Sequence, residues 1–101
     1  MARMRGDLET ASHLKQEAFT HEKEAAELLA DRLDLEPTRS ILYKGAAVLA
    51  LECGFRKEAE QLALRGLQGN PPSPVSEQLQ STLTKATDYP LKPMTSLKTA
   101  S

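Results

Sequence analysis

Two histidines and one glutamate near the N-terminus have the spacing of a metal site. His13 and His21 are eight residues apart with Glu17 between them, so on one straight helix all three side chains would share a face. Imidazole and carboxylate are zinc ligands, but three ligands on one exposed helix face would make a weak site. We therefore expect these residues to be surface polar residues, and we expect no bound metal.

The other residue types that carry catalysis lack partners in the sequence. Cys53 precedes Gly54 at the end of a largely apolar segment with no histidine nearby, and the C-terminal end of a helix disfavours a thiolate. No serine is accompanied by a histidine and an aspartate in a recognisable order, and no glycine-rich phosphate loop is present. The sequence thus predicts no enzyme activity and no cofactor.

The composition favours a single helical domain. The chain has 101 residues, of which 40% are hydrophobic and only 4% aromatic, with no tryptophan. A core of leucine and alanine suits closely packed helices better than a β-sandwich, which needs more β-branched and aromatic residues. A chain of this length leaves room for one such core.

Charge and cysteine usage limit the partners and the compartment. The formal net charge of −1 does not provide the clustered basic face that nucleic-acid binding needs. A single cysteine excludes an intramolecular disulfide and fits a reducing compartment. The basic start lacks the apolar stretch of a secretory signal, and no window approaches the ~18 apolar residues of a membrane span. We expect a cytoplasmic protein that binds neither nucleic acid nor membrane.

The first third of the chain carries a helical pattern with one ambiguity. Apolar residues recur there at spacings of three, four and seven, at Leu8, Ala11, Leu14, Ala18, Ala25, Leu28, Leu29 and Leu33. Without a turn glycine, residues 7–35 form either one long helix or a hairpin bent near Thr20 and His21. We favour the hairpin because Thr20 can cap a helix that starts at His21.

Glycine and proline bound the remaining helices. Pro37 closes the first stretch, and the segment at 38–53 is apolar around much of its circumference, which predicts the buried centre. Gly54 supplies a left-handed position before the next helix, at about 55–69, so these two helices fold back antiparallel. Two prolines then break the chain before a fourth helix at 74–86.

The sequence also repeats itself after 34 residues. EKEAAELLADRLDLEP at 22–37 aligns with RKEAEQLALRGLQGNP at 56–71, and lysine, glutamate, alanine, two leucines and proline coincide. Thirty-four residues is the period of the tetratricopeptide repeat, whose unit is a helix-turn-helix. The second unit has the residue types of that family at Tyr43, Ala47, Gly54, Ala59, Gly66 and Pro71.

The chain therefore resembles the tetratricopeptide repeat family over residues 7–86. The resemblance implies an all-α fold of antiparallel helical hairpins, with about two units and a capping helix. In the family, ligands lie in a groove lined by the first helices of successive hairpins. Carried to this chain, the groove includes Thr10, Leu14, Glu17, Ile41, Lys44, Val48, Leu51 and Glu52.

The type of partner follows from this groove. Lys44 fits the family's clamp for terminal carboxylates, but Gly45 and Val48 stand where that clamp needs asparagine. The apolar stripe of Ile41, Val48 and Leu51 instead suits an amphipathic helix or an extended apolar segment. We predict a protein-binding adaptor without catalysis. The alternative is a self-associating structural protein, such as a homodimer, in which another copy fills the groove.

Flexible segments are expected on both sides of this domain, at 1–6 and 87–101. Pro90 and Pro93 block continuation of the last helix. The tail is more apolar than a solubilising segment requires, at Tyr89, Leu91, Met94 and Leu97. A segment of this kind can also fold over the groove and compete with a partner.

Overall fold

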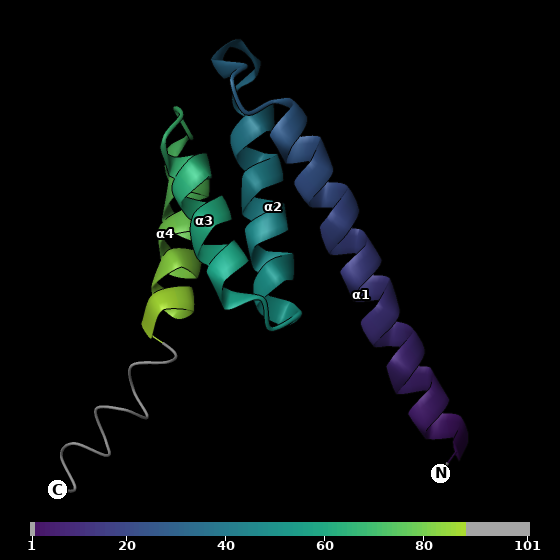
Figure 1. Ribbon diagram of the computed structural model, residues 1–101. Helices are drawn as coiled ribbons and strands as arrows, with labels where there is room; N and C mark the ends of the chain where they lie inside the picture. The colour runs from purple at the N-terminus through teal and green to yellow at the C-terminus, as the bar shows by residue number, and fades with distance from the viewer. Residues whose placement is uncertain (1, 89–101) are drawn as a thin grey trace, which may run out of the picture.

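The computed structural model describes residues 2–88, and the side chains of residues 9–87. It contains a short 3-10 turn, η1 (Leu33–Leu35), and four helices, α1 (Ala2–Leu28), α2 (Thr38–Glu52), α3 (Arg56–Leu67) and α4 (Ser73–Asp88). Residues 2–88 include no strand. Successive helices run in opposite directions, with α2 between α1 and α3 (Figure 1). The predicted all-α architecture of packed antiparallel helices is confirmed.

Helix α2 is the buried centre of the fold, as its sequence predicts. Tyr43, Ala46, Ala47 and Ala50 are all fully buried. Helices α1, α3 and α4 all pack against α2, because its alanines let their backbones approach closely. In α3, Gly66 serves the same purpose, since a Cβ atom there would come within 2.9 Å of the Leu79 side chain.

The turn between α2 and α3 depends on the predicted left-handed glycine. Gly54 has a φ of 82°, which side-chain-bearing residues rarely adopt. The amide N–H of Phe55 donates to the carbonyl of Ala50 at 2.8 Å and thereby closes the end of α2. This turn brings Phe55 to the side of the molecule where α1 lies.

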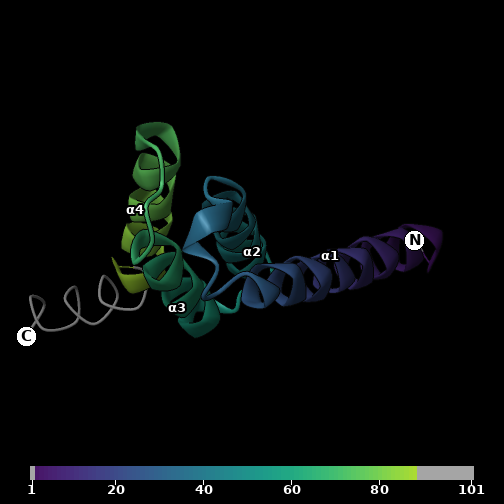
Figure 2. The same cartoon turned by 90° about the horizontal axis from the view of Figure 1, so that it is seen from above.

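Residues 7–35 do not form the hairpin that we favoured. Helix α1 is continuous, and it includes residues 2–6, which we expected to be flexible. The Thr20 hydroxyl donates to the Gln16 carbonyl at 3.0 Å, within the helix, and does not cap a new one. No glycine or proline interrupts residues 7–28, so no backbone signal ends the helix earlier. The N-terminal half of α1 therefore projects past α2, away from the other helices (Figures 1 and 2).

The face of α1 that contacts α2 also differs from the apolar pattern in the sequence. Phe19 and Ala26 are buried, whereas Leu14 is 57% exposed and Leu28 is 81% exposed. The Phe19 ring packs edge-on against the Phe55 ring, with centroids 5.4 Å apart. Lys23 of α1 adds an ion pair to Glu58 of α3 at 2.9 Å. These contacts set the rotation of α1 about its axis.

A buried arginine joins the ends of three helices. Arg39, at the start of α2, is only 3% exposed. Its Nε donates to the Ala30 carbonyl at 2.8 Å, just after α1, and its Nη2 donates to the Arg65 carbonyl at 3.0 Å, near the end of α3. The guanidinium also lies over the Tyr43 ring, 4.9 Å from its centroid. The sequence analysis assigned no role to Arg39.

The C-terminal predictions are only partly covered by the described residues. Helix α4 extends to Asp88, two residues beyond the expected domain end at 86. Residues 89–101, with the apolar tail positions and both prolines, lie outside the described part of the chain. None of the described helices combines the length and the apolar character needed to cross a bilayer.

Candidate functional site

Five of the eight predicted partner-binding residues share one face of α2. At 100° per residue, they fall within about 100° of arc around the helix axis. The five are Ile41, Lys44, Val48, Leu51 and Glu52. Ile41 is 44% exposed, Lys44, Val48 and Leu51 are half-buried, and Glu52 is exposed. In the structure these five residues form a stripe of one exposed and two half-buried apolar side chains beside charged groups, which we call the α2 face.

Helices α1 and α4 border the α2 face. On the α1 side, Gly45 lies so close to the Glu22 side chain that a Cβ atom would come within 2.6 Å of its Oε2. On the α4 side, a hollow of about 390 Å³ is lined by Leu51, Gly54, Arg56 and Lys85. A segment lying along the α2 face would therefore meet Glu22 on one side and Lys85 on the other. The charged groups at the two edges of the α2 face therefore have opposite signs.

The other three predicted residues lie on a different surface. Thr10, Leu14 and Glu17 belong to the projecting half of α1, where residues 9–18 are all exposed. Helix periodicity places them about 140–180° around α1 from Phe19, which packs toward the body of the fold. The structure does not bring these three residues together with the five on the α2 face.

The two histidines and Glu17 share one side of α1, because the helix is continuous. His13 Nε2 lies 3.0 Å from Glu17 Oε2, and both side chains are exposed. Together with Gln16, Thr20 and His21 they line an open hollow of about 340 Å³. Within residues 9–87, no three His, Cys, Asp or Glu side chains are arranged to hold a metal ion. His13, Glu17 and His21 are thus polar residues on the surface, as we expected.

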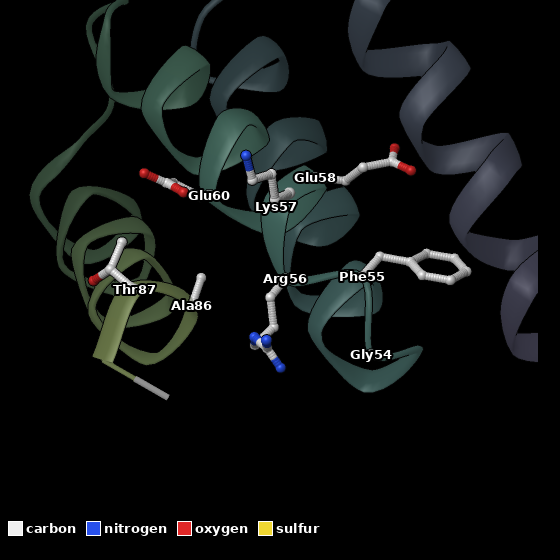
Figure 3. Close-up of a pocket in the computed structure, with 8 residues that line it drawn as sticks. All are labelled: Gly54, Phe55, Arg56, Lys57, Glu58, Glu60, Ala86 and Thr87. Atoms are coloured by element: carbon white, nitrogen blue, oxygen red, sulfur yellow. The ribbon is translucent and has the colours of Figure 1, made fainter. Parts of the chain in front are cut away.

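A larger hollow lies where the turn between α2 and α3 meets the end of α4 (Figure 3). Its volume is about 730 Å³, and it is lined by Gly54, Phe55, Arg56, Lys57, Glu58, Glu60, Ala86 and Thr87. Phe55 and Glu58 point toward α1 and away from the two α4 residues (Figure 3). The lining mixes both charges and includes neither cysteine nor histidine. No sequence pattern indicates this hollow, because its two sides are about thirty residues apart in the chain.

The largely buried carboxylate of Glu36 connects segments that are far apart in the chain. Glu36 Oε1 accepts hydrogen bonds from the amide and the hydroxyl of Ser40, and its Oε2 accepts the Asn70 amide at 2.9 Å. Oε2 also lies 3.6 Å from Nη1 of Arg39. Burial raises the pKa of Glu36, whereas the hydrogen bonds from Ser40 and Asn70 and the charge of Arg39 lower it. The lowering effects are larger together, so the pKa of Glu36 lies below its ordinary value. The ionised carboxylate thus ties the start of α2 to the connection between α3 and α4.

Comparison with known proteins finds no relative of the chain. No family model matches the chain, and no match is found among curated proteins or among solved structures.

Proposed function

We propose that this protein is a tetratricopeptide-like adaptor, without catalysis, that binds a helical or extended apolar segment of a partner protein along the α2 face. The observation that carries the proposal is the row of exposed Ile41 and half-buried Val48 and Leu51, which lies along the helix that is otherwise most buried. The 34-residue repeat supports the family assignment. The single cysteine supports a cytoplasmic location.

The α2 face suits docking because its surroundings are fixed before a partner arrives. Buried alanines hold α2 against its neighbours, and Arg39 joins it to the ends of α1 and α3. A surface that needs no rearrangement loses little conformational entropy on binding. The apolar row then supplies buried area, while Lys44 and Glu52 orient the partner through their charges.

Affinity capture with a matched variant tests this proposal. The wild-type protein and Val48→Glu are immobilised and exposed to an extract of the source cell, and the captured proteins are identified by mass spectrometry. Leu64→Glu is the control, because Leu64 is also an exposed apolar residue, 42% exposed, but lies on α3. We expect a specific protein that Leu64→Glu retains and Val48→Glu loses. Equal capture by all three proteins would remove the α2 face as the binding site.

Self-association through the α2 face is the second candidate. It is favoured by Ile41, which is the one large hydrophobic side chain of α2 that is exposed, at 44%, and which lies beside the half-buried Val48 and Leu51. Sedimentation equilibrium separates the two functions. A dimer that Val48→Glu dissociates would support self-association, whereas a monomer at tens of micromolar would exclude it.

A further inference from the structure

The outer face of α1 carries a stripe of three alanines, two leucines and one histidine. Its members follow one another at alternating spacings of three and four residues, at Ala11, Leu14, Ala18, His21, Ala25 and Leu28. All are exposed except Ala25, which is half-buried. At 1.5 Å per residue the stripe is about 26 Å long. This spacing is the one by which a helix presents a continuous seam to a second helix.

No described part of the chain covers this stripe. Among the described elements, α1 packs on α2, through the side that carries Phe19 and Ala26. The centre of the stripe lies about 140° around the helix from Phe19. Leu28 is 81% exposed and Leu14 is 57% exposed, so the described chain leaves both leucines of the stripe largely uncovered. The outer face of α1 is therefore an unpartnered helix face.

One edge of the stripe is acidic. Helix periodicity places Glu17 and Glu24 directly beside it, and Glu27 one step further around, and all three are exposed. Among residues 9–28, the only group on this edge that can carry a positive charge is His13, which lies 3.0 Å from Glu17. Lys15 lies on the other edge of the stripe. Lys23 is not available to this edge, because it pairs with Glu58 on the opposite side of α1. The stripe and its edge together are called the α1 outer face.

We propose that the α1 outer face docks an amphipathic helix of another protein whose polar edge is basic. Three alanines at every seventh position allow the two helix backbones to approach closely, and Leu14 and Leu28 supply apolar contacts at the two halves of the stripe. Lysine or arginine on the partner would face Glu17 and Glu24. This surface is separate from the α2 face, and the inference does not depend on the proposed function.

Charge argues against a parallel second copy of the chain as the occupant. In one antiparallel arrangement, each alanine of one copy packs against a larger residue of the other copy. Ala11 then lies opposite Leu28, Ala25 opposite Leu14 and Ala18 opposite His21. That pairing brings Glu17 of each copy near Glu24 of the other. A parallel pair instead brings Glu17 of one copy near Glu22 of the other. The parallel pair therefore sets like charges against each other, which disfavours it. In the antiparallel pair the repulsion at Glu17 and Glu24 is opposed on the other edge, where Lys15 of each copy lies near Glu22 of the other.

Two synthetic peptides of 18 residues test the inference. Both carry the same leucine and alanine seam, one has lysine at the edge positions, and the other has glutamate there. Binding of the fluorescently labelled peptides to the full chain is followed by anisotropy at low and at physiological salt. We expect the lysine peptide to bind at least about tenfold more tightly, with a difference that decreases as salt rises. Equal binding of the two peptides, or binding of neither, would overturn the inference.

Substitutions then locate the site. Leu14→Glu should abolish binding of the lysine peptide, while Leu64→Glu on α3 should retain it. The double variant Glu17→Lys with Glu24→Lys should prefer the glutamate peptide, and Glu77→Lys, an exposed glutamate on α4, should not change the preference. Circular dichroism confirms that each variant is folded. Binding that survives Leu14→Glu overturns the inference.

Two further results would overturn the inference about the α1 outer face without affecting the proposed function. Loss of peptide binding in Val48→Glu would place the peptide on the α2 face. A dimer in sedimentation that Leu14→Glu dissociates would make a second copy the occupant of the α1 outer face. Retention of the lysine peptide by Val48→Glu, with a monomeric chain, is the expected result.

Discussion

Replacing Arg39 with methionine tests how strongly one buried side chain holds the helices together. Methionine keeps much of the length of the side chain but removes the guanidinium. The change leaves the carbonyls of Ala30 and Arg65 without their donor and leaves Glu36, whose side chain is 10% exposed, without its counter-ion. It also removes the contact with the Tyr43 ring.

The expected loss is large compared with the stability of a small domain. Removing one partner of a buried ion pair costs about 3–5 kcal/mol, because the other charge loses its counter-ion. Glu36 keeps its hydrogen bonds from Ser40 and Asn70, so we expect a loss near the lower end of this range. The whole domain is expected to be stable by about 5–15 kcal/mol. One kcal/mol shifts the melting temperature of a domain of this size by roughly 4–8 °C, so Arg39→Met should lower it by more than about 12 °C.

Thermal and urea unfolding followed by circular dichroism measure this loss. Arg32→Met is the control, because Arg32 pairs with Asp34 at 2.8 Å but both side chains are more than half exposed. An exposed pair of this kind contributes about 0–1 kcal/mol. The reasoning fails if the two variants lose similar stability. The double variant with Glu36→Gln should lose less than the sum of the two single changes, since both act on one ion pair.

The remaining predictions concern the groups around Arg39. Tyr43→Phe should change the free energy of unfolding by less than about 1 kcal/mol, because the buried hydroxyl makes no hydrogen bond within the described residues. A loss above about 2 kcal/mol in urea unfolding would reveal a partner for that hydroxyl. The lowered pKa of Glu36 predicts acid sensitivity. Its stabilisation is complete above the ordinary pKa of 4.5 and is lost as pH falls through the lower pKa of the folded state. Wild type should therefore exceed Glu36→Gln in stability at pH 7 by clearly more than at pH 3, and an equal difference at both pH values would contradict this.

Most of the fold can be predicted from local signals in the sequence. The segment at 38–53 is apolar around much of its circumference and becomes the central helix, and Gly54 marks the turn that follows it. Both predictions depend only on residues that are neighbours in the chain. The ends of α2, α3 and α4 agree with the expected ranges to within about two residues, because glycine and proline bound them.

The rest could not be predicted because it depends on contacts between distant residues. Arg39 reaches carbonyls 9 and 26 residues away, and Glu36 reaches the Asn70 amide 34 residues away. No periodic pattern reports such contacts, so a charged residue at the start of a helix is read as exposed. The hairpin in residues 7–35 was wrong because Thr20 was taken as a cap, whereas its hydroxyl bonds within a continuous helix.

The rotation of α1 explains why the eight predicted partner-binding residues separate onto two surfaces. Helix α1 has two candidate faces for packing, one with Phe19 and Ala26 and one with the alanine and leucine stripe. Burying an aromatic side chain removes about 150–250 Å² from water, worth roughly 4–6 kcal/mol as an upper estimate. Three alanine methyl groups would contribute about 2–3 kcal/mol. The stripe's leucines could add little, because Leu14 belongs to the half of α1 that projects past α2 and Leu28 ends the helix. The Phe19 side therefore packs toward the body of the fold, and the same contact that fixes α1 turns Leu14 and Glu17 outward, where they form a second surface apart from the α2 face.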